Sequence, residues 1–330
     1  MLDFIKDNRK PVITLGLVTV IAYVFYFLDE IKTTSVLVFG WGYAVPLVLA
    51  AMVGIIGERT GVVNIGIEGQ MLMSAFASFF GSVITGNIYL GMLIGIAAGL
   101  IMGGFLAVAA VKWEMDQIIA GVVINIVAAG LTSFFYAPGK TLPQLVPVVS
   151  IPILSDIPLI GPVFFRNGIF ALATLFIVLA VNFAIFKTRW GLRSRSVGEY
   201  PSAADAAGIN VTRIRMINVT LAGALAGCAG AFLALEAAGT FARGLTAGRG
   251  FLALAIMIFG AWNPMGALAA ALFFGLSTAL ASQLQADEVI NIPQQFVNLL
   301  PFVMTLIVLS VAVGRVRSPA AAGQPYTKEG

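Results

Sequence analysis

Long apolar runs, separated by short polar breaks, dominate the pattern along this chain. A membrane-spanning helix needs roughly 20 residues, and about ten of the runs are candidates for such a helix. They lie at 11–28, 36–57, 61–85, 89–111, 118–136, 168–186, 214–238, 250–262, 265–284 and 295–313. The pattern predicts an all-α, polytopic membrane protein with about ten transmembrane helices and nearly all of its residues in the bilayer.

The first run, 11–28, follows a basic segment and has some features of a signal peptide. It is long for the apolar region of a signal peptide, however, and it continues into Asp29 and Glu30 without a small-residue cleavage site. We therefore interpret 11–28 as the first membrane span.

A basic, polar stretch at 187–215 interrupts the apolar pattern between two long runs. It carries the six cations Lys187, Arg189, Arg193, Arg195, Arg213 and Arg215. Because cytoplasmic loops carry an excess of Lys and Arg, this basic loop is predicted to be cytoplasmic. Within it, EYPSAADAAG predicts a short helix with Pro201 near its first turn and Gly208 at its end. A small cytoplasmic helix held between two spans suits the docking of a soluble partner.

Charge parity supports ten crossings. The N-terminus, the basic loop and the C-terminus all carry cations and are predicted to be cytoplasmic. If 250–284 crossed the membrane only once, the C-terminus would lie outside. If the same residues formed a re-entrant hairpin followed by a span, the number of membrane crossings would change. The Pro-rich loop 137–167 is then external.

The pattern predicts two related halves within a single transmembrane domain, 1–330. Residues 36–136 and 214–313 each hold four apolar runs, and the first set starts outside while the second starts inside. This arrangement predicts two inverted repeats, which transporters commonly use to handle solute near the repeat interface.

Polar residues inside the membrane are costly and are therefore functional candidates. The densest group lies in GERTGVVNIGIEGQ, residues 57–70, where interleaved glycines predict a broken or re-entrant segment that lines a cavity. Asn64, Glu68 and Gln70 could offer donors and acceptors to a polar solute. In the alternative interpretation Glu58 and Arg59 form a loop pair, and Glu68 caps a helix or pairs inside the bundle.

Four further polar residues have two interpretations each. Asn125, in the middle of 118–136, is a candidate for the solute path, although an interhelical hydrogen bond is the simpler role. Glu236, Arg243 and Arg249 fall near the predicted outer end of 214–238 and the loop after it. They form either an outer gate or an interfacial charge cluster.

The composition of the chain argues against most kinds of enzyme active site. The chain is 59% hydrophobic and 10% charged, against about 25% charged residues in soluble domains. It has no histidine, and its single cysteine, Cys228, excludes an intrachain disulfide. PGKT at 138–141 resembles the end of a phosphate-binding loop, but Phe134 stands where that motif needs glycine. No residue spacing predicts a catalytic centre, a metal site or a cofactor site, and the net charge of +4 needs no nucleic acid.

Two segments resemble a known family. GERTGVVNIGIEGQMLMSAF and GLRSRSVGEYPSAADAAGINV resemble the permease subunits of bacterial ABC importers in the branched-chain amino acid and ribose group. They are most similar to nucleoside importers that work with a basic membrane lipoprotein, and the resemblance covers roughly 36–313. It implies that the basic loop carries a helix that docks on the ATP-binding subunit. The implied coupling segment consists of Gly198, Glu199, Tyr200, Pro201, Ala203, Ala204, Ala207 and Gly208.

The resemblance also implies the partners and the location. These are an ABC ATP-binding subunit, a second permease (a paralogue or a second copy), and an extracellular or periplasmic solute-binding lipoprotein, in the cytoplasmic (inner) membrane of a bacterium. ATP hydrolysis would belong to the partner, so this chain is predicted not to be an enzyme.

The sequence leaves alternatives open for the solute and for the class of transporter. A nucleoside is favoured over ribose or another monosaccharide, and branched-chain amino acids come third because no pair of partners for an ammonium and a carboxylate is evident. A stand-alone secondary transporter could use Glu68, but it would leave the basic loop without a purpose.

Overall fold

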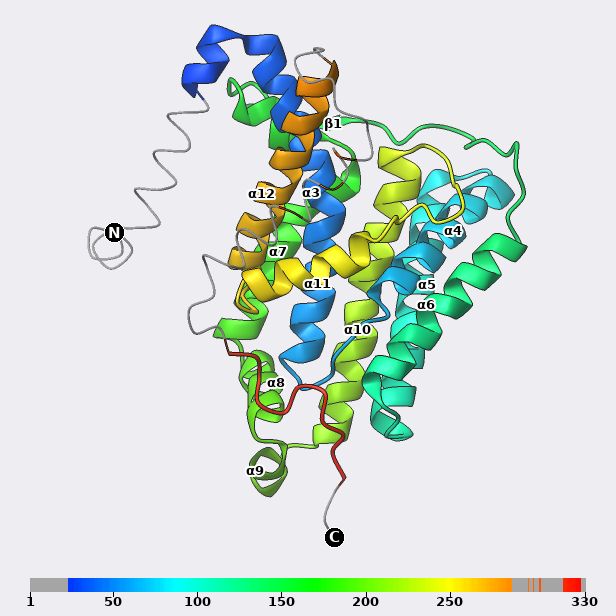
Figure 1. Cartoon of the computed structure of the whole chain (residues 1–330), viewed down its shortest axis with the longest axis vertical. Coiled ribbons are helices and arrows are strands. Elements are labelled where there is room, and N and C mark those ends of the chain that lie inside the picture. Colours follow the sequence, from blue (N-terminus) through cyan, green and yellow to red (C-terminus); the bar gives the residue numbers. More distant parts are fainter. Residues whose placement is uncertain (1–22, 287–295, 297–298, 300–302, 304–316, 328–330) are drawn as a thin grey trace, which may run out of the picture.

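The computed structural model is mostly helical and describes residues 23–286, 296, 299, 303 and 317–327 (Figure 1). Within them, seven helices are long and apolar enough to cross a membrane. They are α3 (Glu30–Glu58), α4 (Ile67–Thr85), α5 (Ile88–Ala107) with its π-helical continuation η1 (Val108–Lys112), α6 (Gln117–Phe134), α7 (Ile169–Lys187), α10 (Val211–Ala231) with its π-helical continuation η3 (Phe232–Ala237), and α12 (Pro264–Ala286). The predicted run 295–313 and most of 11–28 lie outside the described residues, so the ten crossings stay a prediction.

The predicted crossing at 250–262 corresponds to a shorter helix, α11 (Arg249–Phe259). Its 11 residues measure about 17 Å at 1.5 Å per residue, whereas the hydrocarbon core of a bilayer is about 30 Å thick. In Figure 1 it lies obliquely across the long helices, and it packs against α3 and α12. By length, α11 alone is too short to cross the membrane.

Small residues bring the long helices into backbone contact. α5 and α10 face each other through Gly99 and Gly103 on one side and Gly223 on the other. A Cβ added at Gly223 would meet the carbonyl oxygen of Gly99, so only glycine permits this approach. Lipid tails are as apolar as leucine, and close packing of this kind therefore holds membrane helices together. The contact fixes α10, which carries Arg215 near its start and continues into η3 with Glu236.

The two ends of the bundle carry different structures. At one end, the basic loop forms α8 (Arg189–Glu199) and α9 (Pro201–Ala206), which project from the bundle (Figure 1). Pro201 is the first residue of α9, and Gly208, with φ +81°, follows it, which confirms the predicted short helix. At the opposite end, the loop after α6 leads to η2 (Gly161–Phe165) and to strands β1 (Val149–Ser150) and β2 (Arg166–Asn167), which pair antiparallel.

Helix starts divide into two kinds. Several helices are capped by their own N-terminal residue: Asp116 accepts hydrogen bonds of 2.9 Å from Ile118 N and Ile119 N at the start of α6. By contrast, the residues that precede α7 and α11 are Gly168 and Gly248, which have no capping side chain. The free N–H groups of these two helices must therefore find acceptors elsewhere.

Candidate functional site

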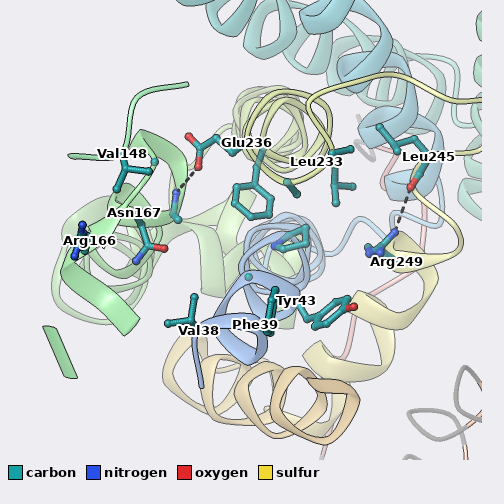
Figure 2. A pocket seen from close by; sticks show the side chains of 17 residues that line it. Val38, Phe39, Tyr43, Val148, Arg166, Asn167, Leu233, Glu236, Leu245 and Arg249 are labelled. Carbon is teal, nitrogen blue, oxygen red and sulfur yellow. Dashed lines mark hydrogen bonds between the residues drawn. The ribbon is translucent and has the colours of Figure 1, made fainter. Parts of the chain in front are cut away.

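A cavity of about 610 Å³ opens between α3, α7, η3 and α11 (Figure 2). Its apolar wall includes Phe39 and Leu233. The polar lining residues include Tyr43, Arg166, Asn167, Glu236 and Arg249. Small-molecule sites usually measure about 300–1,000 Å³ and combine apolar walls with a few polar groups. The cavity has the size and the lining of a site for a small organic solute.

A glutamate at the cavity wall caps α7. Glu236 accepts a hydrogen bond of 2.7 Å from Phe170 N and one of 3.3 Å from Ala171 N. Figure 2 shows the Glu236 side chain at the cavity. A Cβ added at Gly168 would lie 2.5 Å from the Glu236 carboxylate, so glycine at the helix start makes room for it. The side chain that α7 lacks at its own N-terminus is therefore supplied by η3.

A second glutamate caps α11 in the same manner. Glu68, in the first turn of α4, accepts hydrogen bonds from Thr246 Oγ1 (2.6 Å), Gly248 N (2.8 Å) and Gly250 N (2.7 Å). A Cβ at Gly250 would lie 2.5 Å from the Glu68 Cα atom. Of the two interpretations of Glu68 offered by the sequence, the structure shows the capping role.

The two caps determine the electrostatics of the cavity. A helix N-terminus carries a partial positive charge and commonly binds anions. Here Gly168 and Arg249, at the starts of α7 and α11, both line the cavity, and a protein carboxylate already occupies each N-terminus. Arg249 donates through Nη1 to the carbonyls of Leu245 and Thr246, both at 3.2 Å. The two sites where an anionic solute would normally bind are therefore filled.

The predicted broken segment exists between α3 and α4. Residues 59–66 are not helical and are mostly buried, and the Asn125 side chain from α6 bridges them. Its Oδ1 accepts from Gly69 N at 2.7 Å, and its Nδ2 donates to Ile65 O at 3.0 Å. The simpler role considered for Asn125, an interhelical hydrogen bond, is thus present.

Asn64 and Gln70 form a buried pair in this segment. Asn64 Nδ2 donates to Gln70 Oε1 at 3.2 Å, while Asn64 Oδ1 and Gln70 Nε2 have no hydrogen-bond partner among the residues that the structure describes. Asn64, Glu68, Gln70 and Asn125, the predicted solute-path residues, are not among the residues that line the cavity. Glu68 reaches the cavity wall indirectly, through the start of α11, and the solute path itself stays a prediction.

Two charged residues where α3 meets the broken segment bind the turn between α11 and α12. Trp262 Nε1 donates to Glu58 Oε2 at 2.6 Å, and Arg59 Nε donates to the Trp262 carbonyl at 3.1 Å. Burial lowers the pKa of Arg59 from its ordinary value, and the charge of Glu199 opposes that shift. Glu58 and Arg59 thus both bind the same turn, whereas the sequence offered a pair between them.

The segment expected to couple to a partner lies at the projecting end. Ala204 is 4% exposed and packs with Val197 and Val211, so one small residue anchors α9 to the protein. Ala203 is exposed, and Tyr200 is 70% exposed. Gly198 lies against the Arg59 carbonyl, where a Cβ would collide. The result is a short helix with a free surface, attached next to the broken segment.

Sequence reasoning missed the cavity residues Tyr43 and Asn167, and it did not identify Glu236 as a cap. One usable signal was present: Gly168 and Gly248 precede apolar runs with no capping side chain of their own. The sequence does not reveal which distant carboxylate serves each helix.

Comparison with known proteins gives consistent matches. Residues 36–309 match the family model described as branched-chain amino acid transport system / permease component. The chain is 40% identical over 305 residues to the guanosine ABC transporter permease protein NupQ of Bacillus subtilis, and 38% identical over 299 residues to the nucleoside ABC transporter permease protein NupC of Lactococcus lactis. Both alignments cover 87% of this chain and 94% of the relative. A putative glucose ABC transporter permease protein of Haloferax volcanii is 33% identical, over 87% of this chain and 95% of that protein. No solved structure matches the chain.

Proposed function

The chain belongs to the family of branched-chain amino acid transport system permease components, and from this premise we propose that it is the membrane-spanning subunit of an ATP-driven importer of nucleosides. Relatives at 40% and 38% identity are named for guanosine and for nucleosides. The relative at 33% identity is named for glucose, so a monosaccharide is the second candidate.

The carboxylate caps at the cavity carry the proposal of an uncharged solute. An amino acid needs a partner for its carboxylate, and the helix N-termini that would serve are occupied by Glu68 and Glu236. A nucleoside or sugar needs hydrogen bonds and an apolar wall, which Tyr43, Asn167 and Phe39 can provide. The capping pattern favours a neutral solute over a branched-chain amino acid, although Arg166 and Arg249 also line the cavity.

We propose that the solute continues past the broken segment toward the inner face. Asn64 Oδ1 and Gln70 Nε2 offer one free acceptor and one free donor, which suit the edge of a base or a ribose hydroxyl. Glu68 and Asn125 hold that segment against α11 and α6. In this proposal Asn64 and Gln70 contact the solute, while Glu68 and Asn125 shape the path.

The energy would come from a separate ATP-binding subunit docked on the projecting end. The proposed contact residues are Gly198, Glu199, Tyr200, Pro201, Ala203, Ala204, Ala207 and Gly208. Closure of the ATPase pair would push α9, and the spans would rock so that the path faces alternately out and in. A second permease and an external solute-binding lipoprotein complete the proposed importer.

The proposed topology follows the charge pattern. Ten crossings, with inverted repeats at 36–136 and 214–313, would put both termini and the basic loop in the cytoplasm. Because α11 alone is too short to cross, this count requires neighbouring residues to complete the crossing at 250–262. The membrane would be the cytoplasmic membrane of a bacterium.

Uptake competition tests the solute. In cells that express the complete importer, unlabelled guanosine, adenosine or uridine should suppress uptake of a labelled nucleoside, whereas ribose, glucose and leucine in equal excess should not. Suppression by glucose or ribose alone would favour the monosaccharide alternative. Suppression by leucine would contradict the neutral-solute argument from Glu68 and Glu236.

A further inference from the structure

We propose that Arg215 is a positioning residue for energy coupling, and that it holds residues 317–327 as a strap across the projecting end of the bundle. Arg215 lies in the first turns of α10 and is 2% exposed. The strap, drawn in red in Figure 1, crosses beside α8 and the start of α10. A buried arginine is costly unless its donors are used. Among the described residues, Nε and Nη1 of Arg215 have acceptors and Nη2 has none, so the first two contacts indicate its role.

The guanidinium of Arg215 joins two segments that are far apart in the sequence. Nε donates to the Thr60 carbonyl at 3.0 Å, and Nη1 donates to the Gln324 carbonyl at 2.8 Å. Arginine presents its donors in a rigid fork, which suits two acceptors held at a fixed separation. Nη2 lies 2.5 Å from where a Cβ of Gly61 would be, and Gly61 has φ +88°. Glycine at 61 therefore leaves space for the guanidinium.

Main-chain hydrogen bonds also bind the strap to the broken segment and to α8, on either side of this arginine. Gly323 N donates to the Gly61 carbonyl at 3.2 Å, and Ala321 N donates to the Gly198 carbonyl at 2.9 Å. Ala320 N also donates to Glu199 Oε2 at 3.3 Å. Ala321 is only 3% exposed, whereas the neighbouring Ala320 is exposed. The strap thus binds the end of α8, the broken segment and α10 at once.

These contacts give a route for motion. Gly198 and Glu199 belong to the proposed coupling segment, and Gly61 lies in the broken segment that leads to Glu68 and the start of α11. A push on α9 would reach the cavity through the broken segment if α8 and that segment move together. Gly198 of α8 already packs against the Arg59 carbonyl, and the strap and Arg215 join the two segments further. This inference rests on the proposed function for its transport readout, whereas the seating of the strap can be tested without transport.

Thiol labelling tests whether the strap is seated in the assembled importer. Ala321→Cys and Ala320→Cys form a matched pair, because they are neighbours that differ in exposure. In inside-out vesicles a membrane-impermeant maleimide should label Ala320→Cys readily and Ala321→Cys slowly, and adding Arg215→Ala should expose position 321. The only native cysteine, Cys228, is buried. Equal labelling of 320 and 321 without Arg215→Ala would overturn the strap.

Uptake per ATP hydrolysed tests the role in coupling. Arg215→Ala, and a truncation after residue 316, should each lower this ratio by at least about tenfold while ATP hydrolysis continues, within the range of known coupling effects. Arg213→Ala, two residues away and exposed, should leave the ratio unchanged. The truncated Arg215→Ala chain should lose no more than Arg215→Ala alone, because both changes remove one link. A normal ratio of uptake to ATP hydrolysis in the truncated chain would contradict the proposal, and so would additive losses of this ratio in the doubly changed chain. If the unmodified importer showed no ATP-dependent uptake, the proposed function would be contradicted instead.

Discussion

Ala203→Trp is expected to abolish ATP-driven uptake while leaving the subunit folded. Ala203 is exposed on α9, so the larger side chain meets solvent in the isolated chain. A surface change of this kind usually alters the free energy of unfolding by no more than about 0.5 kcal/mol. In the complete importer the indole would instead lie at the proposed contact with the ATP-binding subunit, where a small residue is expected. Uptake and co-purification of the ATP-binding subunit should both fall to background.

The matched control for this prediction is Arg213→Trp. It places the same side chain at another exposed position of the same end, outside the coupling segment. Its uptake should stay within about twofold of the unmodified importer, because exposed changes away from an interface have small effects. If Ala203→Trp kept full uptake and bound the ATPase normally, α9 would not be the docking element.

Glu68→Ala is expected to be the most destabilising single change discussed for the bundle. It removes the acceptor of three hydrogen bonds and leaves Thr246 Oγ1, Gly248 N and Gly250 N without their partner. Unpaired buried donors cost about 1–3 kcal/mol each, so we expect a loss of about 2–4 kcal/mol in the free energy of unfolding, allowing for relaxation. Thermal unfolding in detergent would measure it as a lowered Tm.

Glu236→Ala provides the comparison for this prediction. That carboxylate accepts two backbone hydrogen bonds, and the longer of them is 3.3 Å, so its removal should lower the Tm less. Glu68→Gln, which keeps one acceptor oxygen, should fall between Glu68→Ala and the unmodified chain. Equal Tm values for Glu68→Ala and the unmodified chain would show that α11 does not depend on this cap.

Local signals predicted the local structure. Pro201 and Gly208 bracket α9 because proline fits the first helical turn and glycine readily adopts a positive φ. The interleaved glycines of 57–70 predicted a break, and residues 59–66 are irregular. Both features depend on backbone preferences of neighbouring residues, which are directly readable from a sequence.

Long-range partners were not readable in this way. Glu68 caps a helix that begins 180 residues later, and Arg215 binds a carbonyl 109 residues away. In a soluble protein, apolar periodicity indicates which face of a helix is buried. Here most residues of every long helix are apolar, so the pattern identifies spans without indicating their neighbours. The cavity and the strap both depend on those neighbours.

Reconstitution tests the central claim, that a partner ATPase supplies the motion of this chain. Proteoliposomes containing the complete importer with its binding protein should concentrate labelled guanosine when ATP is supplied on the ATPase side. Vesicles that contain only this chain should take up none above the control, with or without an ion gradient. Concentrative uptake by this chain alone would contradict the account.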